Sequence, residues 1–282
     1  MGEQRRQALA AALERRFGNA ADLAAAAPHQ ALPTLAGLAA HRVIRGYADR
    51  PVPDALIDLV CAAALSVPSK SDLQQRDLIV VTAPDTRARL TELCGNDPWM
   101  PSAPVWLVVC GNHRRQRQLH DWRGHGFAND HLDAFFNATV DAALALAWAV
   151  AAAEAAGLGC CPISQIRNHP EAVAALLTLP AHVFPVAGLT LGWPAHPGTL
   201  SPRLELAATV HRERFDDGAA RSQVAAYDAR RAALQPYRRQ RDIGRFGTAP
   251  VYGWSEEKAR HYAEPQRTGF GAYIRSIGFR LD

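Results

Sequence analysis

The chain has 282 residues, of which 48% are hydrophobic and 21% are charged, and its mean hydropathy is -0.15. These values are typical of a soluble globular protein and exclude a disordered, collagen-like or fibrous chain. A formal charge of +4 and a pI near 8.9 are too small a basic excess to indicate nucleic-acid binding. Arginine supplies almost all of the basic residues, because Lys70 and Lys258 are the only lysines.

Cysteine usage and apolar runs predict a soluble cytoplasmic protein without a metal site or a membrane partner. The five cysteines are odd in number and lack a C-x-x-C spacing, which argues against a disulfide framework. Cys160 and Cys161 are interpreted as small core residues, with a redox role as the weaker alternative. The N-terminus lacks the apolar core of a signal peptide. The longest apolar stretch, Ala142–Ala153, is shorter than the about 20 residues that cross a bilayer.

The first half of the chain alternates helical and strand patterns. Helical spacing predicts a helix over Gln4–Phe17, ending at Gly18, and a second from Asp54 to about Leu65. Further along the chain we expect a short strand over Leu78–Thr82, a helix from Asp85 to about Gly95, and a strand over Val105–Cys110 that is buried on both faces.

The second half centres on one long apolar helix. The polar stretch Gly111–Asp130 is predicted to be a loop or a mobile excursion, and Leu132–Ala156 to be the longest helix. This helix is apolar nearly all round, so it either threads the core or packs against a second copy of the chain. Asn168 and Glu171 resemble a capping box, and Val183–Leu191 reads as another buried strand. Together these elements predict one elaborated α+β domain.

Two short segments are rich in groups that bind anions. The first, HRVIR at 41–45, places two arginines and a histidine where they could converge on a phosphate, although a solvated charged turn is the simpler interpretation of this segment alone. The second, PSKSDLQ at 68–74, crowds hydroxyl, ammonium and amide donors into one turn. A serine hydrolase is excluded as a first interpretation, because no serine lies three residues before Lys70 and no G-x-S-x-G occurs.

Two further segments are candidates for binding. Glycines in the stretch 157–168 allow a ligand to approach the backbone, and Pro162 could lie on a flat heteroaromatic ring. The histidines between 113 and 131 are interpreted as a solvated segment rather than as metal ligands. Pro202-Arg203 is uninformative by itself.

Taken in order, these segments resemble the FMN-dependent nitroreductase family, and within it the NADPH-dependent oxygen-insensitive nitroreductases and flavin reductases. The resemblance rests on HRVIR, PSKSDLQ, AAEAAGLGCCPISQIRN, LPAHVFPVAGLTLGWPA and SPRL, at residues 41–45, 68–74, 152–168, 179–195 and 201–204. It implies an intertwined homodimer with a central, mainly antiparallel sheet flanked by helices. Residues 1–39 are expected to be a helical extension without a counterpart, residues 40–282 the FMN-binding domain, and residues 217–282 its surface-wrapping tail.

The resemblance also implies where FMN is held and which residues hold it. His41, Arg42, Arg45 and Arg203 would bind the phosphate and ribitol, with Ser69 and Ser71 coming from the partner subunit. Pro162, Ile163 and Ser164 would line the flavin ring, with a main-chain N–H near Gln165 donating to N5. The remaining candidate cofactor residues are Val43, Lys70, Gln74, Asp97 and Ser201, several of which depart from the family's pattern.

No protein nucleophile is implied, because the cofactor carries the chemistry. Hydride would pass from NADPH or NADH through FMN to a small electron-poor acceptor, a nitroaromatic, a quinone or a flavin, in a ping-pong cycle. The alternatives are a reductive dehalogenase or activated-alkene reductase on the same site, a non-catalytic flavin-binding protein and, most remote, a nucleic-acid binder. The candidates for binding NADPH are tail arginines, for which a solvated basic turn is equally simple: Arg238, Arg239, Arg241 and Arg245.

Overall fold

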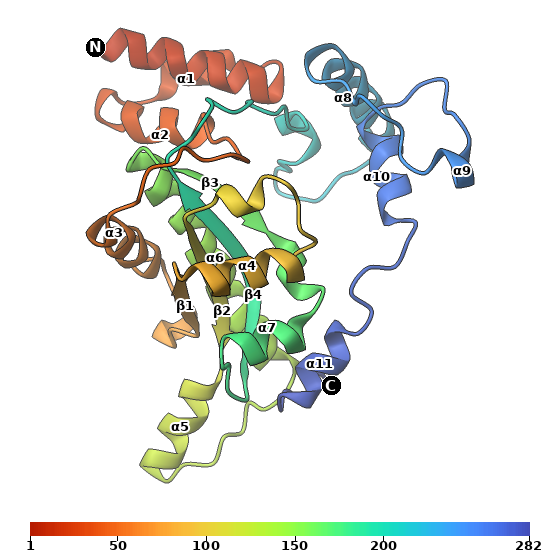
Figure 1. The fold of residues 1–282 in the computed structure, drawn as a ribbon. Coiled ribbons are helices and arrows are strands. Elements are labelled where there is room, and N and C mark those ends of the chain that lie inside the picture. The colour runs from red at the N-terminus through yellow and green to blue at the C-terminus, as the bar shows by residue number, and fades with distance from the viewer. The chain divides into compact units, whose positions relative to one another are not determined.

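The computed structural model describes residues 1–282, which fold into two compact units (Figure 1). Unit 1 contains residues 1–42 and 199–266. Unit 2 contains residues 43–198 and 267–282. Each unit is assembled from stretches that are far apart in the sequence.

A four-stranded sheet forms the centre of unit 2. Its strand order is β1-β2-β4-β3, and every neighbouring pair is antiparallel, as the sequence led us to expect. The two central strands are buried along their whole length, because helices cover both faces. Pro185 fits inside β4 because it lies opposite a register shift at Val109 and Cys110. The strands are β1 (Arg76–Val81), β2 (Val105–Asn112), β3 (Gly159–Ile163) and β4 (Val183–Gly192).

Alternate residues of β2 face two different helical layers. Leu107 packs with α3 and α6 on one side, whereas Trp106 and Val108 pack with α4 and α7 on the other. This alternation is the period-two pattern of a strand buried on both faces. The helices of unit 2 are α3 (Asp54–Leu65), α4 (Pro84–Leu93), α5 (Arg114–Arg123), α6 (Leu132–Ala155), α7 (Pro170–Leu176) and α11 (Phe270–Ser276).

Helix α6 buries only one of its faces in the chain. That face is alanine-rich and includes a single carboxylate, Asp141, while Phe136 and Trp148 on other faces are 60% and 45% exposed. Of the two alternatives raised by the sequence, a helix that is enclosed by its own chain is therefore excluded. By length and composition alone α6 could cross a membrane, but a core helix packed on a sheet passes the same test.

Two local predictions are wrong. The stretch 111–130 is not a loop throughout, because it contains the polar helix α5, which ends at the left-handed Gly124 and is attached to β1 by an ion pair between Arg115 and Asp77. Helix α7 has no capping box, since its N-cap is His169 and the Asn168 side chain instead accepts a hydrogen bond from Arg267. In both places a contact with a residue distant in sequence determines the local structure, and the local sequence pattern contains no sign of that contact.

Unit 1 is helical. A small apolar cluster that includes Leu9 and Leu32 joins the first two helices, and Tyr227 packs edge-to-face on Trp254 to join two later ones. The first helix ends at Gly18 with a left-handed φ of 86°, as the sequence predicts. The helices are α1 (Gly2–Phe17), α2 (Leu32–Ala39), α8 (Ala220–Leu234), α9 (Ile243–Phe246) and α10 (Trp254–Tyr262).

Candidate cofactor-binding site

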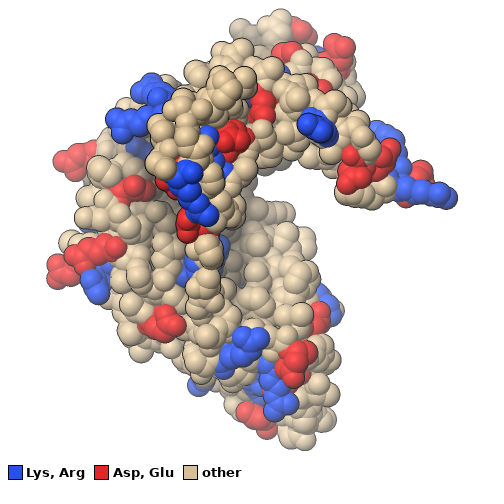
Figure 2. Space-filling model, turned by 90° about the vertical axis from the view of Figure 1, so that its right-hand side faces the viewer, with Lys and Arg blue, Asp and Glu red and all other residues tan.

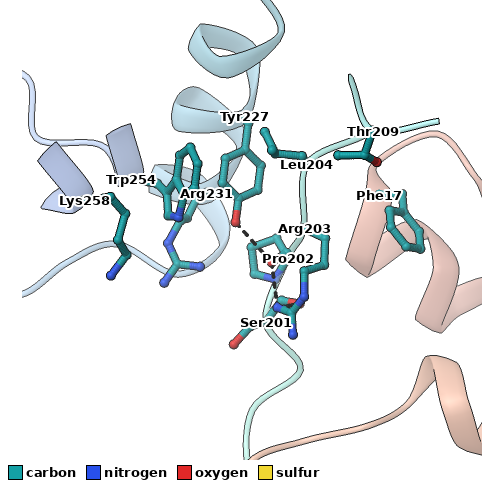
Figure 3. A pocket seen from close by; sticks show the side chains of 10 residues that line it. All are labelled: Phe17, Ser201, Pro202, Arg203, Leu204, Thr209, Tyr227, Arg231, Trp254 and Lys258. Carbon is teal, nitrogen blue, oxygen red and sulfur yellow. Dashed lines mark hydrogen bonds between the residues drawn. The ribbon is translucent and has the colours of Figure 1, made fainter. Parts of the chain in front are cut away.

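Unit 1 contains a cavity of about 500 Å³ (Figure 3). Ser201 and Arg203, two of the predicted cofactor residues, lie on its wall. Arg231 and Lys258 add two more cations, and no aspartate or glutamate lines the cavity. The other lining residues are Phe17, Pro202, Leu204, Thr209, Tyr227 and Trp254. A cationic cavity with aromatic walls suits a ligand that carries both a phosphate and a ring.

The wall that carries Arg203 is held from α8. Tyr227, which is buried, donates its hydroxyl proton to the carbonyl of Pro202 at 3.1 Å, and this bond is drawn in Figure 3. Arg230 donates to the carbonyl of Arg203. The Arg203 side chain is exposed, so its guanidinium is accessible to a ligand.

His41 and Arg42 are half-buried residues of the same unit. The carbonyl of His41 accepts a hydrogen bond from Arg16, which also donates to the carbonyl of Ser201 at 2.9 Å. The buried guanidinium of Arg16 therefore hydrogen-bonds the backbone of both predicted segments, at His41 and at Ser201.

The four tail arginines fall into two classes. Arg241 pairs with Glu257 at 3.0 Å, and Arg245 pairs with Glu264. Arg238 and Arg239 are exposed, and neither forms an ion pair of the kind that holds Arg241 and Arg245. On the face drawn in Figure 2, lysine and arginine side chains are interspersed with aspartate and glutamate, unlike the continuous basic surface of a nucleic-acid binder.

In unit 2, Asp141 of α6 organises the predicted serine-rich turn. One carboxylate oxygen accepts from the Ser69 hydroxyl at 2.6 Å and from the backbone N–H of Gln75 at 2.9 Å, and the other accepts from the N–H of Lys70 at 3.0 Å. The Ser69 oxygen in turn accepts the N–H of Gln74 at 2.7 Å. Ser69 is therefore bound within the protein rather than turned to solvent.

The same turn has an uncommon backbone. Ser71, Asp72 and Gln74 have φ values of 50°, 56° and 51°, in the left-handed region that residues other than glycine rarely occupy. Such conformations persist only where surrounding contacts hold them, and they cluster at ligand sites. Lys70, Ser71 and Gln74 expose their side chains, which leaves an ammonium, a hydroxyl and an amide accessible on a turn whose backbone is fixed.

Strand β3 supplies the other predicted part of the site. Cys161 and Ile163 are buried, whereas Pro162 between them is exposed and can offer its ring to a ligand. Burial raises the pKa of both Cys160 and Cys161, which favours packing over thiolate chemistry. The neighbouring Arg45 cation lowers the pKa of Cys161 and the half-buried Asp97 raises it, both by less than burial does.

The turn after β3 is held by a residue that the sequence did not single out. Arg267 donates to the Ser164 hydroxyl at 3.1 Å and to the Asn168 side-chain oxygen at 3.1 Å. The side chain of Gln165 lies beside Gly95. A Cβ added at Gly95 would be 3.3 Å from Nε2 of Gln165. Val43 forms an isolated bridge with Cys160 and has no polar side chain to offer.

Comparisons with known proteins decide the family. The profile described as the nitroreductase family matches residues 38–193, and that of its C-terminal domain matches residues 201–282. The chain belongs to the nitroreductase family. The two matches leave residues 1–37 of this nitroreductase-family protein outside the family pattern. The predictions of family, α+β fold and enzyme class, an oxidoreductase, are confirmed.

The relatives of this nitroreductase-family protein include flavin and nitro reductases. It is 32% identical to an FMN reductase [NAD(P)H] of Bacillus subtilis, over 86% of this chain and 96% of that protein. It is 38% identical to an oxygen-insensitive NADPH nitroreductase of Salmonella typhimurium, over 65% of this chain and 75% of that protein. The solved structure of NfrA2 of B. megaterium, 31% identical, superposes with a TM-score of 0.80 over 88% of this chain and 98% of that one. The names of these relatives agree with the predicted cofactors, FMN and NAD(P)H.

Proposed function

We propose that this protein is an FMN-dependent oxidoreductase that takes hydride from NAD(P)H and reduces a small electron-poor acceptor. The observation that carries the proposal is the cationic, aromatic-walled cavity of unit 1, on which Ser201 and Arg203 of the family's C-terminal domain lie. The family and the names of the relatives supply the redox class.

The residues present fit FMN at both of its ends. A phosphate ester carries about −1.5 to −2 charges at neutral pH and accepts several charge-assisted hydrogen bonds. The guanidiniums of Arg42 and Arg203 and the fixed donor turn with Lys70 and Ser71 are donors of that kind. The exposed Pro162 on β3 is a suitable apolar surface for a planar ring.

In the proposed site, the protein binds and orients while the cofactor reacts. When bound, FMN supplies the two-electron chemistry, accepting hydride at N5 and passing electrons to the acceptor. His41, Arg42, Arg45 and Arg203 hold the phosphate and ribitol, and the turn at Ser164–Gln165 offers a main-chain N–H to the ring. Arg267 fixes that turn through Ser164, so the donor is oriented before a ligand arrives.

For the electron donor, we propose that Arg238 and Arg239 bind the 2′-phosphate of NADPH. They are exposed, whereas Arg241 and Arg245 are already paired with carboxylates. The double substitution Arg238→Ala/Arg239→Ala should raise KM for NADPH about tenfold and leave KM for NADH nearly unchanged, because only NADPH carries the extra phosphate. The matched control Arg241→Ala should change the two KM values equally. An equal rise for both nucleotides in the double variant would contradict the assignment.

For the acceptor, we propose a nitroaromatic, a quinone or a free flavin. Ser164 is exposed and Gln165 is half-buried in the turn that we propose beside the flavin ring. A pocket narrowed by these side chains would favour a different acceptor, so reductive dehalogenation or activated-alkene reduction is the second candidate. Steady-state rates with nitroaromatic and quinone panels, measured beside halophenol and enone panels, distinguish the two. A preference for halophenols or enones would select the second candidate.

We also propose that the protein is a homodimer through α6. Phe136, Leu144 and Trp148 are separated by eight and four residues, so they lie along one side of the helix, and all three are exposed in the single chain. Large apolar side chains gathered on one helix face typically mark a protein–protein interface.

A further inference from the structure

The C-terminal end of α1 is attached to the segment that carries Ser201 and Arg203. Helix α1 lies within residues 1–37, which neither family profile matches. All the contacts that follow are made within unit 1. The attachment therefore joins a segment outside the family pattern to one that the family pattern includes.

Arg16 is the centre of this attachment. The residue is only 6% exposed, and its guanidinium uses three nitrogens to donate to three different carbonyls. Nε donates to Ala39 at 2.9 Å, Nη1 donates to Ser201 at 2.9 Å, and Nη2 donates to His41. A planar guanidinium with five N–H donors is the side chain best suited to link three backbone segments in a fixed geometry.

The backbone of Arg16 continues the link. Its carbonyl accepts the N–H of Arg203 at 2.6 Å and Nη1 of Arg230 at 3.1 Å. The next turn passes through Gly18, where an added Cβ would lie 2.8 Å from Cδ of Arg230. The absence of a side chain at Gly18 is thus what lets Arg230 reach the Arg16 carbonyl.

Every carbonyl from residue 200 to residue 203 has a donor elsewhere in unit 1. Arg15 donates to Leu200 at 3.3 Å, and Tyr227 and Arg230 donate to Pro202 and Arg203. With Arg16 on Ser201, the segment is fixed along its whole length. A segment held this way loses little conformational entropy when its side chains bind a ligand.

We infer that Arg16 is a positioning residue for the phosphate end of the FMN site, so that the N-terminal extension sets how tightly this chain retains its flavin. The inference rests on the proposed function, because it takes His41, Arg42 and Arg203 as ligands of the FMN phosphate and ribitol, with Ser201 as a neighbouring cofactor residue. Arg16 hydrogen-bonds the backbone of His41, Ser201 and Arg203. The residues proposed to contact the flavin ring belong to a different part of the chain. Loss of Arg16 should therefore weaken the hold on the phosphate and not the hold on the ring.

The test compares FMN with riboflavin, which lacks the phosphate, by titrating apoprotein and following flavin fluorescence. Arg16→Met should raise the Kd for FMN about tenfold and change the Kd for riboflavin by less than about twofold. The matched control is Arg6→Met, because Arg6 also donates to three carbonyls, those of Ala24, Ala25 and Ala27, but all of them lie within the extension. It should leave both Kd values unchanged.

A second variant guards against misfolding of Arg16→Met. Arg230→Met removes the donors to the carbonyls of Arg16 and Arg203 from α8, and it should reproduce the selective loss of FMN affinity. Equal weakening of FMN and riboflavin in both variants, or an effect no larger than that of Arg6→Met, would overturn the inference while FMN binding by the wild-type chain stands. A wild-type chain that binds neither flavin contradicts the proposed function, and the inference with it.

Discussion

Asp141 is the one residue on the buried face of α6 that is not alanine, and it determines the conformation of the 69–75 turn. In Asp141→Asn, the amide nitrogen would face a backbone N–H or the Ser69 hydroxyl, so at least one buried donor loses its acceptor. We expect the free energy of unfolding to fall by about 2–3 kcal/mol, measured by urea denaturation. The exposed Asp58→Asn on α3 is the control and should change it by less than about 0.5 kcal/mol. Equal stability of the two variants would show that the turn does not depend on Asp141.

His113 makes stability depend on pH. It is 3% exposed, and its ring packs at 5.0 Å from Phe127 and 6.0 Å from Phe279. Burial, assisted by the neighbouring Arg117 cation, lowers the pKa of His113 from 6.5 to about 4. As the pH falls, the unfolded chain therefore takes up this proton before the folded chain does. The free energy of unfolding should be largest above pH 6.5 and decrease by up to about 3 kcal/mol on approaching pH 4.

The variant His113→Phe isolates this effect. Phenylalanine fits among the two neighbouring aromatic rings and does not titrate, so the decrease between pH 6.5 and 4 should become smaller. Denaturation curves at several pH values measure it. If wild type and variant lose stability in parallel, the pH dependence comes from other groups, of which His182 is the nearest with a lowered pKa.

At the scale of elements, the edge strand β3 and the segment 43–45 must lie close together. The N–H of Ile44 donates to the carbonyl of Cys160 at 2.9 Å, and a Cβ on Gly159 would lie 2.7 Å from the Ile44 side chain. Gly159→Ala should therefore lower the free energy of unfolding by about 1–3 kcal/mol through overpacking, and displace Arg45 enough to weaken FMN binding.

The control for that variant is a glycine with space around it. A Cβ at Gly37 in α2 meets nothing within 4 Å, so Gly37→Ala should be neutral or stabilise by up to about 1 kcal/mol. Thermal denaturation and FMN titration compare the two. If Gly159→Ala has the same free energy of unfolding as the wild type, residues 43–45 can move away from β3 without loss of stability, which would contradict the prediction.

How far the sequence predicts each element depends on where its specifying contacts lie. Apolar patterning predicts β2, β4 and α6 within a few residues, because burial alone shapes them. It fails for α5, which is polar and depends on Arg115 and on contacts to β1. Candidate ligands such as Arg203 and Pro162 follow from family motifs, whereas Asp141, Arg16 and Arg267 act through partners distant in sequence. One feature of the sequence points to Asp141: it is the only carboxylate at the helical spacing of the buried alanines of α6.

At the scale of the molecule, the exposed apolar face of α6 predicts self-association. Trp148→Glu places a charge on that face and should convert a dimer into a monomer in sedimentation velocity, since an unpaired charge is costly to bury. Trp122→Glu is the control, because Trp122 is 70% exposed and belongs to a different helix, α5. A wild-type chain that sediments as a monomer would contradict the proposed dimer.

The proposed function requires a flavin that accepts electrons while it is bound to this chain. The most direct measurement is an anaerobic titration with NADPH of purified protein reconstituted with FMN, following the visible absorbance of the flavin after unbound FMN has been removed. We predict that about one FMN per chain stays with the protein and that its absorbance is lost as NADPH is added and returns when a nitroaromatic or quinone is admitted. A protein that retains no FMN, or whose bound FMN keeps its absorbance with both NADPH and NADH, would contradict the proposed function.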